Sequence, residues 1–559
     1  MRIPALRLFL CTSLLATAAA GSDAPLLDPA DYGHFQRRAT TRSPEAQRWF
    51  NQGLALAYSF DHDNAIRSFQ EATKLDPEFA LAWWGIAHAA GMHINLPILT
   101  PDRNALAREA LGHAQRHAAK ATPVERALIA AQAKRYAEQV PTDLGPLNNA
   151  HAEAMRAVWK EFPRDADVGV LFVESLMNLR PWDYWKPDGS PHPTTVEAIA
   201  ALDRVLELNP DHPQALHLYI HAVEASPDPA RAIPMADRLR RLQPGLGHMV
   251  HMPSHIDVIT GSWAESIQAN ERAVVSDRET RGRFGTPPGF LWLYMGHNRH
   301  MLAFGAMMSG RGQLAQKHIA DLMAELPLQT SWAKDWGFVA DYFAPMQLEV
   351  LVRFGRWDEI LAAGEPPANQ PITRTLRHGA RAIAFAAKGD TTSARAEQAK
   401  FVAARAAIPA EAYYGNSGHV AVLATAEAMI DGEILIFEGR RDEGIARLRE
   451  AVALEDKLRY NEPPDWIIPV RHTLGAALLN SGRFREAEQV YREDLKKWPN
   501  NGWSLFGLAR ALKHLGRADE AKQVEAQFAR VWAQADTDIT SSCLCQPFAN
   551  EPVKTAAAR

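Results

Sequence analysis

The stretch "WFNQGLALAYSFDHDNAIRSFQEATKLDP", from Trp49 to Pro77, decides the fold. Its apolar residues recur every three or four positions, which places them on one face of a helix. Pro77 ends the second of two such runs, because proline cannot continue the helical hydrogen-bond ladder. The stretch therefore predicts two helices joined by a turn.

Similar units recur along the chain with a spacing of 34 residues, as in the intervals Pro210–Pro244, Gly355–Gly389 and Gly482–Gly516. The opening stretch also carries apolar and small residues at the positions of one known repeat: Trp49, Gly53, Leu56, Ala65, Phe69, Ala72 and Pro77. It resembles the tetratricopeptide repeat (TPR) family. This resemblance implies an all-α fold, a superhelix of stacked antiparallel helix pairs, here with inserted loops.

The first twenty residues differ in character from the rest. Arg2 and Arg7 are basic, residues 8–16 are apolar, and residues 18–20 are three alanines. This order is typical of a secretory signal peptide with its cleavage site. We therefore predict a periplasmic or secreted protein that has no stable membrane anchor after residues 1–20 are removed.

The remaining chain divides into four predicted parts. They are a mature N-terminal segment (21–45), an N-terminal TPR array with a histidine-rich groove (46–330), a C-terminal TPR array (331–535) and a C-terminal tail (536–559). Two stretches with Pro and Gly, Leu179–Thr195 and Arg278–Phe290, are predicted loops.

The composition limits the classes of partner. The chain is 47% hydrophobic with a net charge of −4, which excludes wholesale disorder and gives no reason to expect nucleic acid. Outside the predicted signal peptide only Cys543 and Cys545 remain, so no disulfide framework is expected. This CxC pair fits two thiolate metal ligands, an intermolecular disulfide or an inert tail.

Histidines form a stripe in three consecutive units. Counted from Pro210, Pro244 and the turn glycines Gly261 and Gly310, they recur at the same offsets: His217, His221, His248, His251, His255, His297 and His300. The TPR resemblance implies that these positions lie on the first helix of each pair and face the concave groove. Neighbouring helix axes are roughly 8–10 Å apart, so the imidazoles are expected to converge.

Neutral imidazole is the commonest transition-metal ligand, and the stripe therefore predicts a metal site. The candidate ligands are His217, His221, His251, His255, His297 and His300. Four further residues are candidates for orienting these ligands or replacing one: His248, Glu224, Glu174 and His88. Copper is preferred slightly over zinc and iron. Pro253 lies inside this predicted helix and should kink it, whereas His113, His117 and His318 fall outside the register and are read as structural.

Three functions fit this groove. A metalloenzyme, either an oxidoreductase or a hydrolase, would act on a small molecule or peptide, with Trp182, Asp183 and Tyr184 as a candidate groove loop. A periplasmic metal carrier would bind the ion reversibly. A non-catalytic scaffold would bind a peptide or protein in the same groove. The sequence contains no phosphate-binding GxxxxGK[ST] loop and no GxSxG elbow.

Two motifs, "HMPSHI" and "LRPWDYW", are distinctive. With stretches such as "ALHLYIHAVEAS" and "GHNRHMLAF", they make the chain similar to a family of exported bacterial TPR proteins. That resemblance implies export and a TPR solenoid, and it implies no particular reaction.

Overall fold

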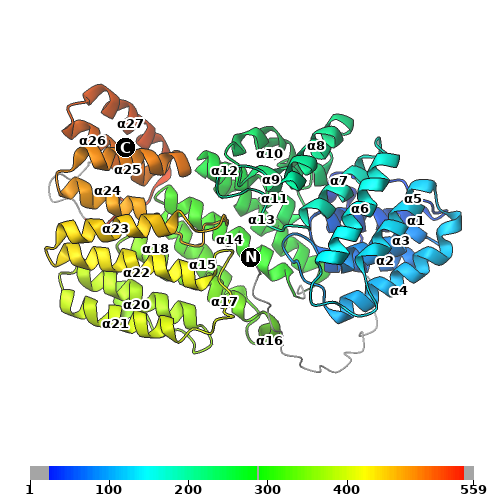
Figure 1. Cartoon of the computed structure of the whole chain (residues 1–559), viewed down its shortest axis with the longest axis horizontal. Helices are drawn as coiled ribbons and strands as arrows, with labels where there is room; N and C mark the ends of the chain where they lie inside the picture. The colour runs from blue at the N-terminus through cyan, green and yellow to red at the C-terminus, as the bar shows by residue number, and fades with distance from the viewer. Residues whose placement is uncertain (1–23, 286–288, 331, 547–559) are drawn as a thin grey trace. The chain divides into compact units, whose positions relative to one another are not determined.

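The computed structural model describes residues 24–285, 289–330 and 332–546, and its regular elements there are all helices (Figure 1). The described residues contain no strand, only the isolated bridges His93–Leu96 and Trp185–Pro191. The predicted all-α fold of antiparallel helix pairs is confirmed. The predicted signal peptide and residues 547–559 lie outside the described residues. Within the described part, no helix combines the length and apolar character that crossing a membrane requires.

The chain forms two compact units. The N-terminal unit comprises residues 24–256 and 272–291, and the C-terminal unit comprises 257–271 and 292–546, within the described ranges. The division falls in α12 (Pro253–Thr260), α13 (Trp263–Phe284) and α14 (Leu291–Met308). The predicted end of the first array at residue 330 stays a prediction. Within the C-terminal unit, α15 (Gly312–Glu325) packs against α18 (Pro345–Arg353).

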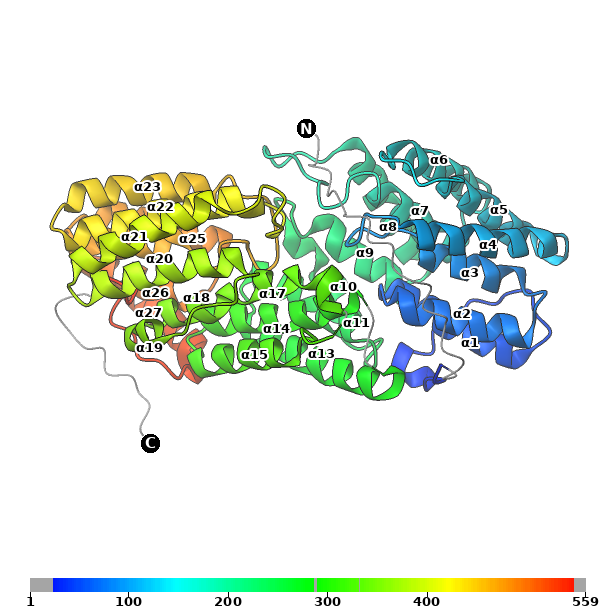
Figure 2. The same cartoon turned by 90° about the horizontal axis from the view of Figure 1, so that it is seen from below.

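The N-terminal unit begins with the stretch that decided the fold. Its two helices are α1 (Pro44–Tyr58), whose first turn is capped by the Ser43 side chain, and α2 (His62–Leu75). Gly53 of α1 and Gly85 of α3 (Ala80–Ala90) both lie against the Phe69 ring of α2. A Cβ atom at either glycine would be within 2.7 Å of ring carbons. Figure 2 shows these helices stacked side by side. The later helices are α3 (Ala80–Ala90), α4 (Pro101–His117), α5 (Pro123–Gln132), α6 (Gly145–Glu161), α7 (Ala166–Met177), α8 (Pro193–Leu208), α9 (Pro213–Val223), α10 (Ile233–Leu239) and α11 (Gly247–His251).

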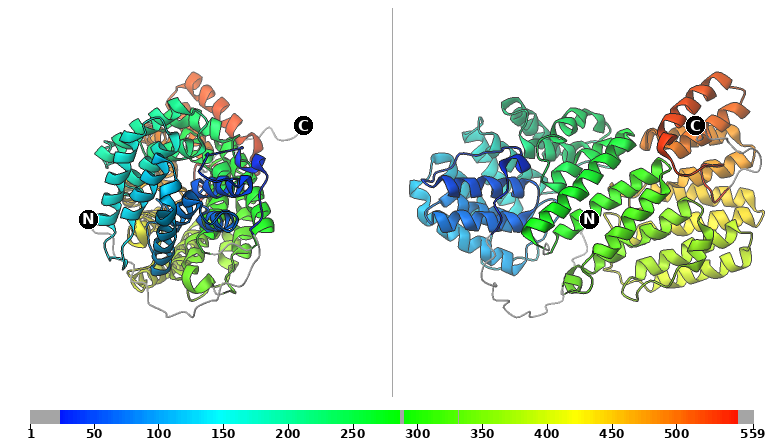
Figure 3. Two further views of the ribbon diagram at one scale, coloured as in Figure 1. Left: turned by 90° about the vertical axis from the view of Figure 1, so that its right-hand side faces the viewer. Right: turned by 180° about the vertical axis from the view of Figure 1, so that it is seen from behind.

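The C-terminal unit repeats the same design (Figure 3). Its remaining helices are α16 (Trp332–Trp336), α17 (Phe338–Phe343), α19 (Trp357–Ala362), α20 (Pro371–Ala387), α21 (Thr391–Ala406), α22 (Gly418–Phe437), α23 (Arg441–Glu455), α24 (Val470–Asn480), α25 (Phe484–Lys497), α26 (Gly502–His514) and α27 (Ala518–Val531). The turn glycines Gly389, Gly482 and Gly516 have φ between 70° and 85°. Glycine suits these turns because other residues rarely adopt a left-handed conformation.

Early and late helices of the C-terminal unit contact each other. The indole Nε1 of Trp503 on α26 donates to the carbonyl of Met307 on α14 at 2.8 Å. The Trp263 indole donates to the Pro499 carbonyl at 3.1 Å, and the Trp532 ring lies against Gly310. These contacts tie helices that are about two hundred residues apart in sequence.

The C-terminal tail is docked rather than loose up to residue 546. Asp536 accepts hydrogen bonds from the Gly312 and Gln313 amides at 2.8 and 2.9 Å, and the Ser542 hydroxyl donates to the His472 carbonyl at 2.8 Å. Cys543 and Cys545 are buried and joined by a disulfide within the chain. This pairing differs from all three sequence-based interpretations, because the turn at the docked tail brings the two Cα atoms to 5.2 Å.

The predicted loop Arg278–Phe290 is wrong over its first half. Helix α13 continues to Phe284, because "RETRGRF" contains mostly good helix formers. Gly285, with φ of 83°, follows the end of the helix.

Candidate metal centre

Five predicted histidines meet in the interior of the N-terminal unit. His217 and His221 come from α9, His248 and His251 from α11, and His255 from α12. All five side chains are buried, with at most 6% of each residue exposed. The equal offsets along the repeats therefore do place these imidazoles together. They lie below the surface rather than along an open groove wall.

Three of them can offer ring nitrogens to one point. In the set His217, His221 and His248, one nitrogen from each lies within 4.8 Å of the others. The Nε2 atoms of His217 and His248 are 3.1 Å apart. His217 donates through Nδ1 to the Tyr58 carbonyl at 2.9 Å, so its neutral form carries the lone pair on Nε2. The geometry thus directs that lone pair toward His248.

Glu224 holds the imidazoles of His221 and His255. Its two carboxylate oxygens accept from Nδ1 of His221 at 2.9 Å and from Nδ1 of His255 at 2.7 Å. A carboxylate on one ring nitrogen fixes the tautomer and makes the opposite nitrogen the better donor to a metal. In both imidazoles that opposite nitrogen is Nε2. The role of Glu224 in orienting metal ligands stays a prediction.

The helix is interrupted at the proline between His251 and His255, where the sequence predicted a kink. Helix α11 ends at His251 and α12 begins at Pro253, with Met252 between them. The His255 amide bonds to the Met252 carbonyl at 3.2 Å, a three-residue turn. The two imidazoles meet with their Nε2 atoms 2.7 Å apart.

An aromatic ring lies among the imidazoles. The centroid of Phe60 is 4.6 Å from that of His217 and 5.6 Å from that of His248. Phe60 occupies the turn between α1 and α2 with φ of 59°, a left-handed conformation. Trp182, from the predicted groove loop, also has a positive φ of 62° and lies with its ring edge-on to His221 at 5.4 Å. Strained backbone of this kind concentrates at functional sites.

Sequence reasoning missed two histidines of this region, His62 and His93. The His93 ring stacks on Phe60 at 4.7 Å and meets the His62 ring at 4.5 Å. Neither ring nitrogen of His62 has a hydrogen-bond partner among the described residues, although the side chain is buried. The sequence did contain one signal for this region. Phe60 occupies a turn position at which most helix-pair turns of this chain have glycine.

Burial favours the neutral form of His217, His248 and His62. It lowers the pKa of His217 well below 6.5, with a further lowering from His221. Burial likewise lowers the pKa of His248 and His62, and neighbouring imidazoles add to both shifts. Neutral imidazole is the form that ligates a metal, so no proton must first be removed from these rings near pH 7.

The other predicted residues of this unit lie beside the cluster. Burial raises the pKa of Glu174 to about 7 and lowers that of His88 to about 3, and their side chains are 3.9 Å apart. Both line an enclosed cavity of about 10 Å³, room for one water molecule. Tyr184 is buried, whereas Asp183 is half exposed and pairs with Arg180. The loop therefore directs Trp182, and not Asp183, at the histidines.

His297 and His300 lie on α14 in the C-terminal unit. His300 is buried against Tyr342 and Phe343, and burial lowers its pKa to about 3. Their role as ligands stays a prediction. The structural interpretation of His113 and His117 also stays a prediction. The His113 ring stacks on the Trp83 ring at 4.2 Å.

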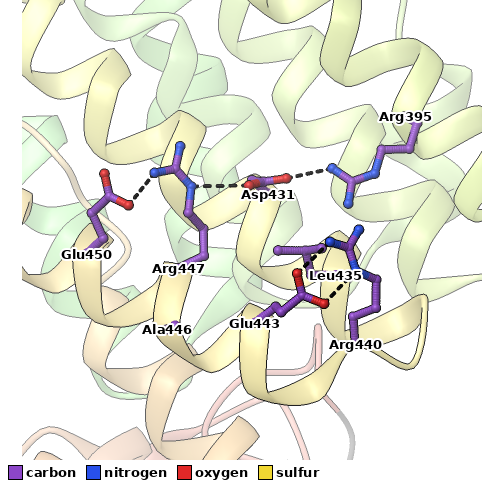
Figure 4. A pocket seen from close by; sticks show the side chains of 8 residues that line it. All are labelled: Arg395, Asp431, Leu435, Arg440, Glu443, Ala446, Arg447 and Glu450. Atoms are coloured by element: carbon purple, nitrogen blue, oxygen red, sulfur yellow. Dashed lines mark hydrogen bonds and ion pairs between the residues drawn. The ribbon is translucent and has the colours of Figure 1, made fainter.

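The C-terminal unit has an open depression of about 540 Å³ between α21, α22 and α23 (Figure 4). Its charged side chains are paired with one another. Asp431 accepts from Arg395 at 2.6 Å and from Arg447 at 3.1 Å, and Arg440 pairs with Glu443. Exposed pairs of this kind are worth about 0–1 kcal/mol each and point to no ligand.

Comparisons with known proteins agree with the repeat architecture. Two stretches, residues 46–79 and 478–527, match family models of the tetratricopeptide repeat. No curated protein matches the chain in sequence. A solved structure of the human IFIT1 dimer with m7Gppp-AAAA is 12% identical, covers 90% of this chain and 93% of its own, and has a TM-score of 0.33. Yeast Tom70 is 10% identical, with 87% and 90% covered and a TM-score of 0.29. The family-model matches show that this all-helical chain carries tetratricopeptide repeats at residues 46–79 and 478–527.

Proposed function

We propose that this protein binds a transition-metal ion through the histidine cluster of its N-terminal unit. His217, His221 and His248 are the ligands, and His251 and His255 form an adjoining pair. The observation that carries the proposal is the convergence of ring nitrogens from α9 and α11 within 4.8 Å. Copper stays the preferred ion, with zinc and iron as alternatives.

The spacing of the nitrogens supports one shared ion. Two nitrogens bound to a tetrahedral zinc at about 2.0–2.1 Å are about 3.3 Å from each other. The Nε2 atoms of His217 and His248 are 3.1 Å apart, so a modest side-chain shift would admit an ion. Without an ion, the same contact is an N–H···N hydrogen bond between the two rings.

The surroundings of the cluster support binding more than turnover. All five imidazoles are buried, and the rings of Phe60 and Trp182 lie against them. A closed site suits an ion that is held, as in a carrier or a structural centre. A peptide substrate would need a path that such burial does not offer. The predicted export of the chain would place this site outside the cytoplasm.

Elemental mass spectrometry tests the proposal directly. Full-length protein is purified without chelator and without a histidine tag, then exposed to Cu²⁺, Zn²⁺ or Fe²⁺ separately and desalted. We expect about one equivalent of one metal per chain. A wild-type protein that stays metal-free after all three loadings would refute metal binding at this cluster.

Matched histidine pairs make the test specific. His217→Gln with His248→Gln should abolish retention of the ion. His113→Gln with His117→Gln on α4, where both side chains are partly exposed, should leave it unchanged. Metal should also stabilise the folded wild type by about 2.7 kcal/mol at a concentration one hundred times Kd, which a rise in melting temperature would report. This measurement checks binding even if the first variant misfolds.

A second candidate function is a scaffold that binds a protein or peptide, for which TPR arrays are typical. The docked tail favours it. Residues 536–546 lie as a non-helical segment against several helices of the C-terminal unit, and this contact supports the proposal. A chain truncated after residue 535 that binds the synthetic 536–546 peptide in isothermal titration would support this function. Absence of that binding would count against it.

A further inference from the structure

The docked tail brings two sulfurs to a buried carboxyl in the C-terminal unit. Cys543 and Cys545 lie beside Glu433 of α22, and one ligand atom from each residue lies within 4.8 Å of the other two. All three residues are buried, with Glu433 and Cys545 fully inaccessible to solvent. Soft sulfur and a hard carboxylate oxygen together suit zinc and related divalent ions.

Among the described residues, Glu433 has only one weak hydrogen-bond partner. Its Oε1 accepts one long hydrogen bond from Thr473 at 3.5 Å, and its Oε2 has no hydrogen-bond partner among the described residues. Burying a carboxyl without compensation costs free energy. Burial raises the pKa of Glu433 to about 8, so the group is mostly neutral at pH 7. The fold thus places an unpartnered, buried carboxyl oxygen next to two sulfurs.

We propose that Cys543, Cys545 and Glu433 form a second metal site, which opens when their disulfide is reduced and takes a zinc-class divalent ion. The histidine cluster plays no part in this site, so the two proposals stand or fall separately. Three protein ligands leave one position of a tetrahedral ion for a water molecule or another group.

The reaction balances with a dithiol as the reductant. A thiolate of the dithiol attacks one sulfur of the Cys543–Cys545 bond, and its second thiol then releases the mixed disulfide. The reductant ends as a disulfide, and the chain gains two electrons and two protons as two thiols. Binding of the ion displaces both thiol protons and the Glu433 proton. The resulting centre has two thiolates, one carboxylate and one divalent cation, with a net charge of −1.

Cadmium is the probe, because Cd²⁺ bound to thiolate has an ultraviolet charge-transfer band that imidazole ligands do not produce. Full-length protein is reduced with a dithiol, desalted under argon and titrated with Cd²⁺, beside an untreated sample. Thiol counting should show two more thiols after reduction. We expect the band to saturate at about one equivalent in the reduced protein only. A disulfide that the dithiol cannot open in the folded protein, or a reduced protein without the band, would overturn the proposal.

Two isosteric variants separate the ligand from its surroundings. Glu433→Gln resembles the neutral acid, so the fold should persist, and Cd²⁺ affinity should fall at least about tenfold. Glu349→Gln is the matched control: Glu349 is also buried, with its pKa raised to about 8, but does not belong to the converging set. Equal affinities for Glu433→Gln and wild type would remove Glu433 from the site. Cys543→Ser with Cys545→Ser should abolish the band.

Discussion

At the scale of single residues, Phe60 shows how a repeat turn has been modified. The Asp61 amide bonds to the Leu56 carbonyl at 2.9 Å, as the Arg311 amide does to the Ala306 carbonyl at 2.8 Å in the turn of Gly310. Both turns need a left-handed residue, and a non-glycine residue is costly there, by about 1–3 kcal/mol. The chain accepts this cost at a turn whose side chain lies among the histidines.

The cost of the left-handed backbone predicts which of two Phe60 variants is the more stable. Phe60→Ala should lower the free energy of unfolding by about 3–5 kcal/mol, because it removes a buried ring and keeps the strain. Phe60→Gly removes the same ring but relieves the strain, so it should be about 1 kcal/mol more stable than Phe60→Ala. Urea denaturation followed by circular dichroism measures both. A glycine variant less stable than the alanine variant would contradict strain at this turn.

Glu224 carries the second residue-scale prediction. Glu224→Gln keeps the size of the side chain but can no longer accept from both His221 and His255 as a carboxylate does. Loss of such an orienting group typically lowers metal affinity 10–100-fold. A competition titration with a chromogenic chelator measures the change, and Glu349→Gln serves as the control with an equally buried acid. Unchanged affinity would show that Glu224 does not orient the ligands.

The sequence predicted some of these residues for a clear reason. Equal offsets from turn glycines and closing prolines put His217, His221 and His248 on neighbouring helices, and the structure brings them together. His62 and His93 have no such register, since His62 opens a second helix and His93 follows the end of α3. Only the three-dimensional turn around Phe60 brings them near the cluster.

At the scale of elements, Asp167 connects the segment before α1 with the helices α1, α7 and α9. On α7, it accepts from Arg37 at 2.8 Å and from the Tyr58 hydroxyl of α1 at 2.8 Å. It also lies 3.2 Å from the His212 Nε2 at the start of α9. Burial alone would raise the pKa of Asp167, but Arg37 and His212 outweigh burial and hold that pKa well below its usual range.

The lowered pKa predicts acid sensitivity of the N-terminal unit. The stability from Asp167 is fully present above its unfolded pKa of about 3.9 and is lost as the pH falls toward its folded pKa. Asp167→Asn should cost about 3 kcal/mol near neutral pH, because Arg37 loses one buried partner and keeps Asp165. Denaturant melts at pH 7 and pH 3.5 should therefore differ less for the variant than for wild type. Asp211→Asn, which removes an exposed partner of Arg238, should change neither value appreciably.

Local periodicity explains why the helix pairs were predictable and some other elements were not. The stretch Trp49–Pro77 forms α1 and α2 as expected, because both the apolar spacing and the turn are local. The predicted loop Arg278–Phe290 was wrong where α13 continues, since Gly282 and the surrounding polar residues resemble a loop when they are considered alone. Docking of residues 536–546 depends on partners such as Gly312, more than two hundred residues away, and no local pattern encodes it.

At the scale of the whole molecule, buried acids should make stability fall in mild alkali. The folded pKa of Glu349 is about 8, whereas an unfolded glutamate has about 4.3, so the folded chain binds the extra proton between these values. Unfolding free energy should thus decrease by up to about 1.4 kcal/mol between pH 7 and pH 8 for each such group. Glu349→Gln should reduce this dependence of the unfolding free energy on pH by the contribution of one glutamate. Denaturant melts at pH 7.0, 7.5 and 8.0 measure it, and an identical slope in the variant would contradict the raised pKa.

The contacts of Trp503 with Met307 and of Asp536 with Gly312 change how the C-terminal unit should come apart. An open solenoid can fray from either end, because each repeat touches only its neighbours. Here the late helices are fastened to the early ones, so neither end is a free starting point for unzipping. Residues 536–546 follow α27 in the chain and complete this closure, so the unit should acquire its full cooperativity only after these residues have been synthesised.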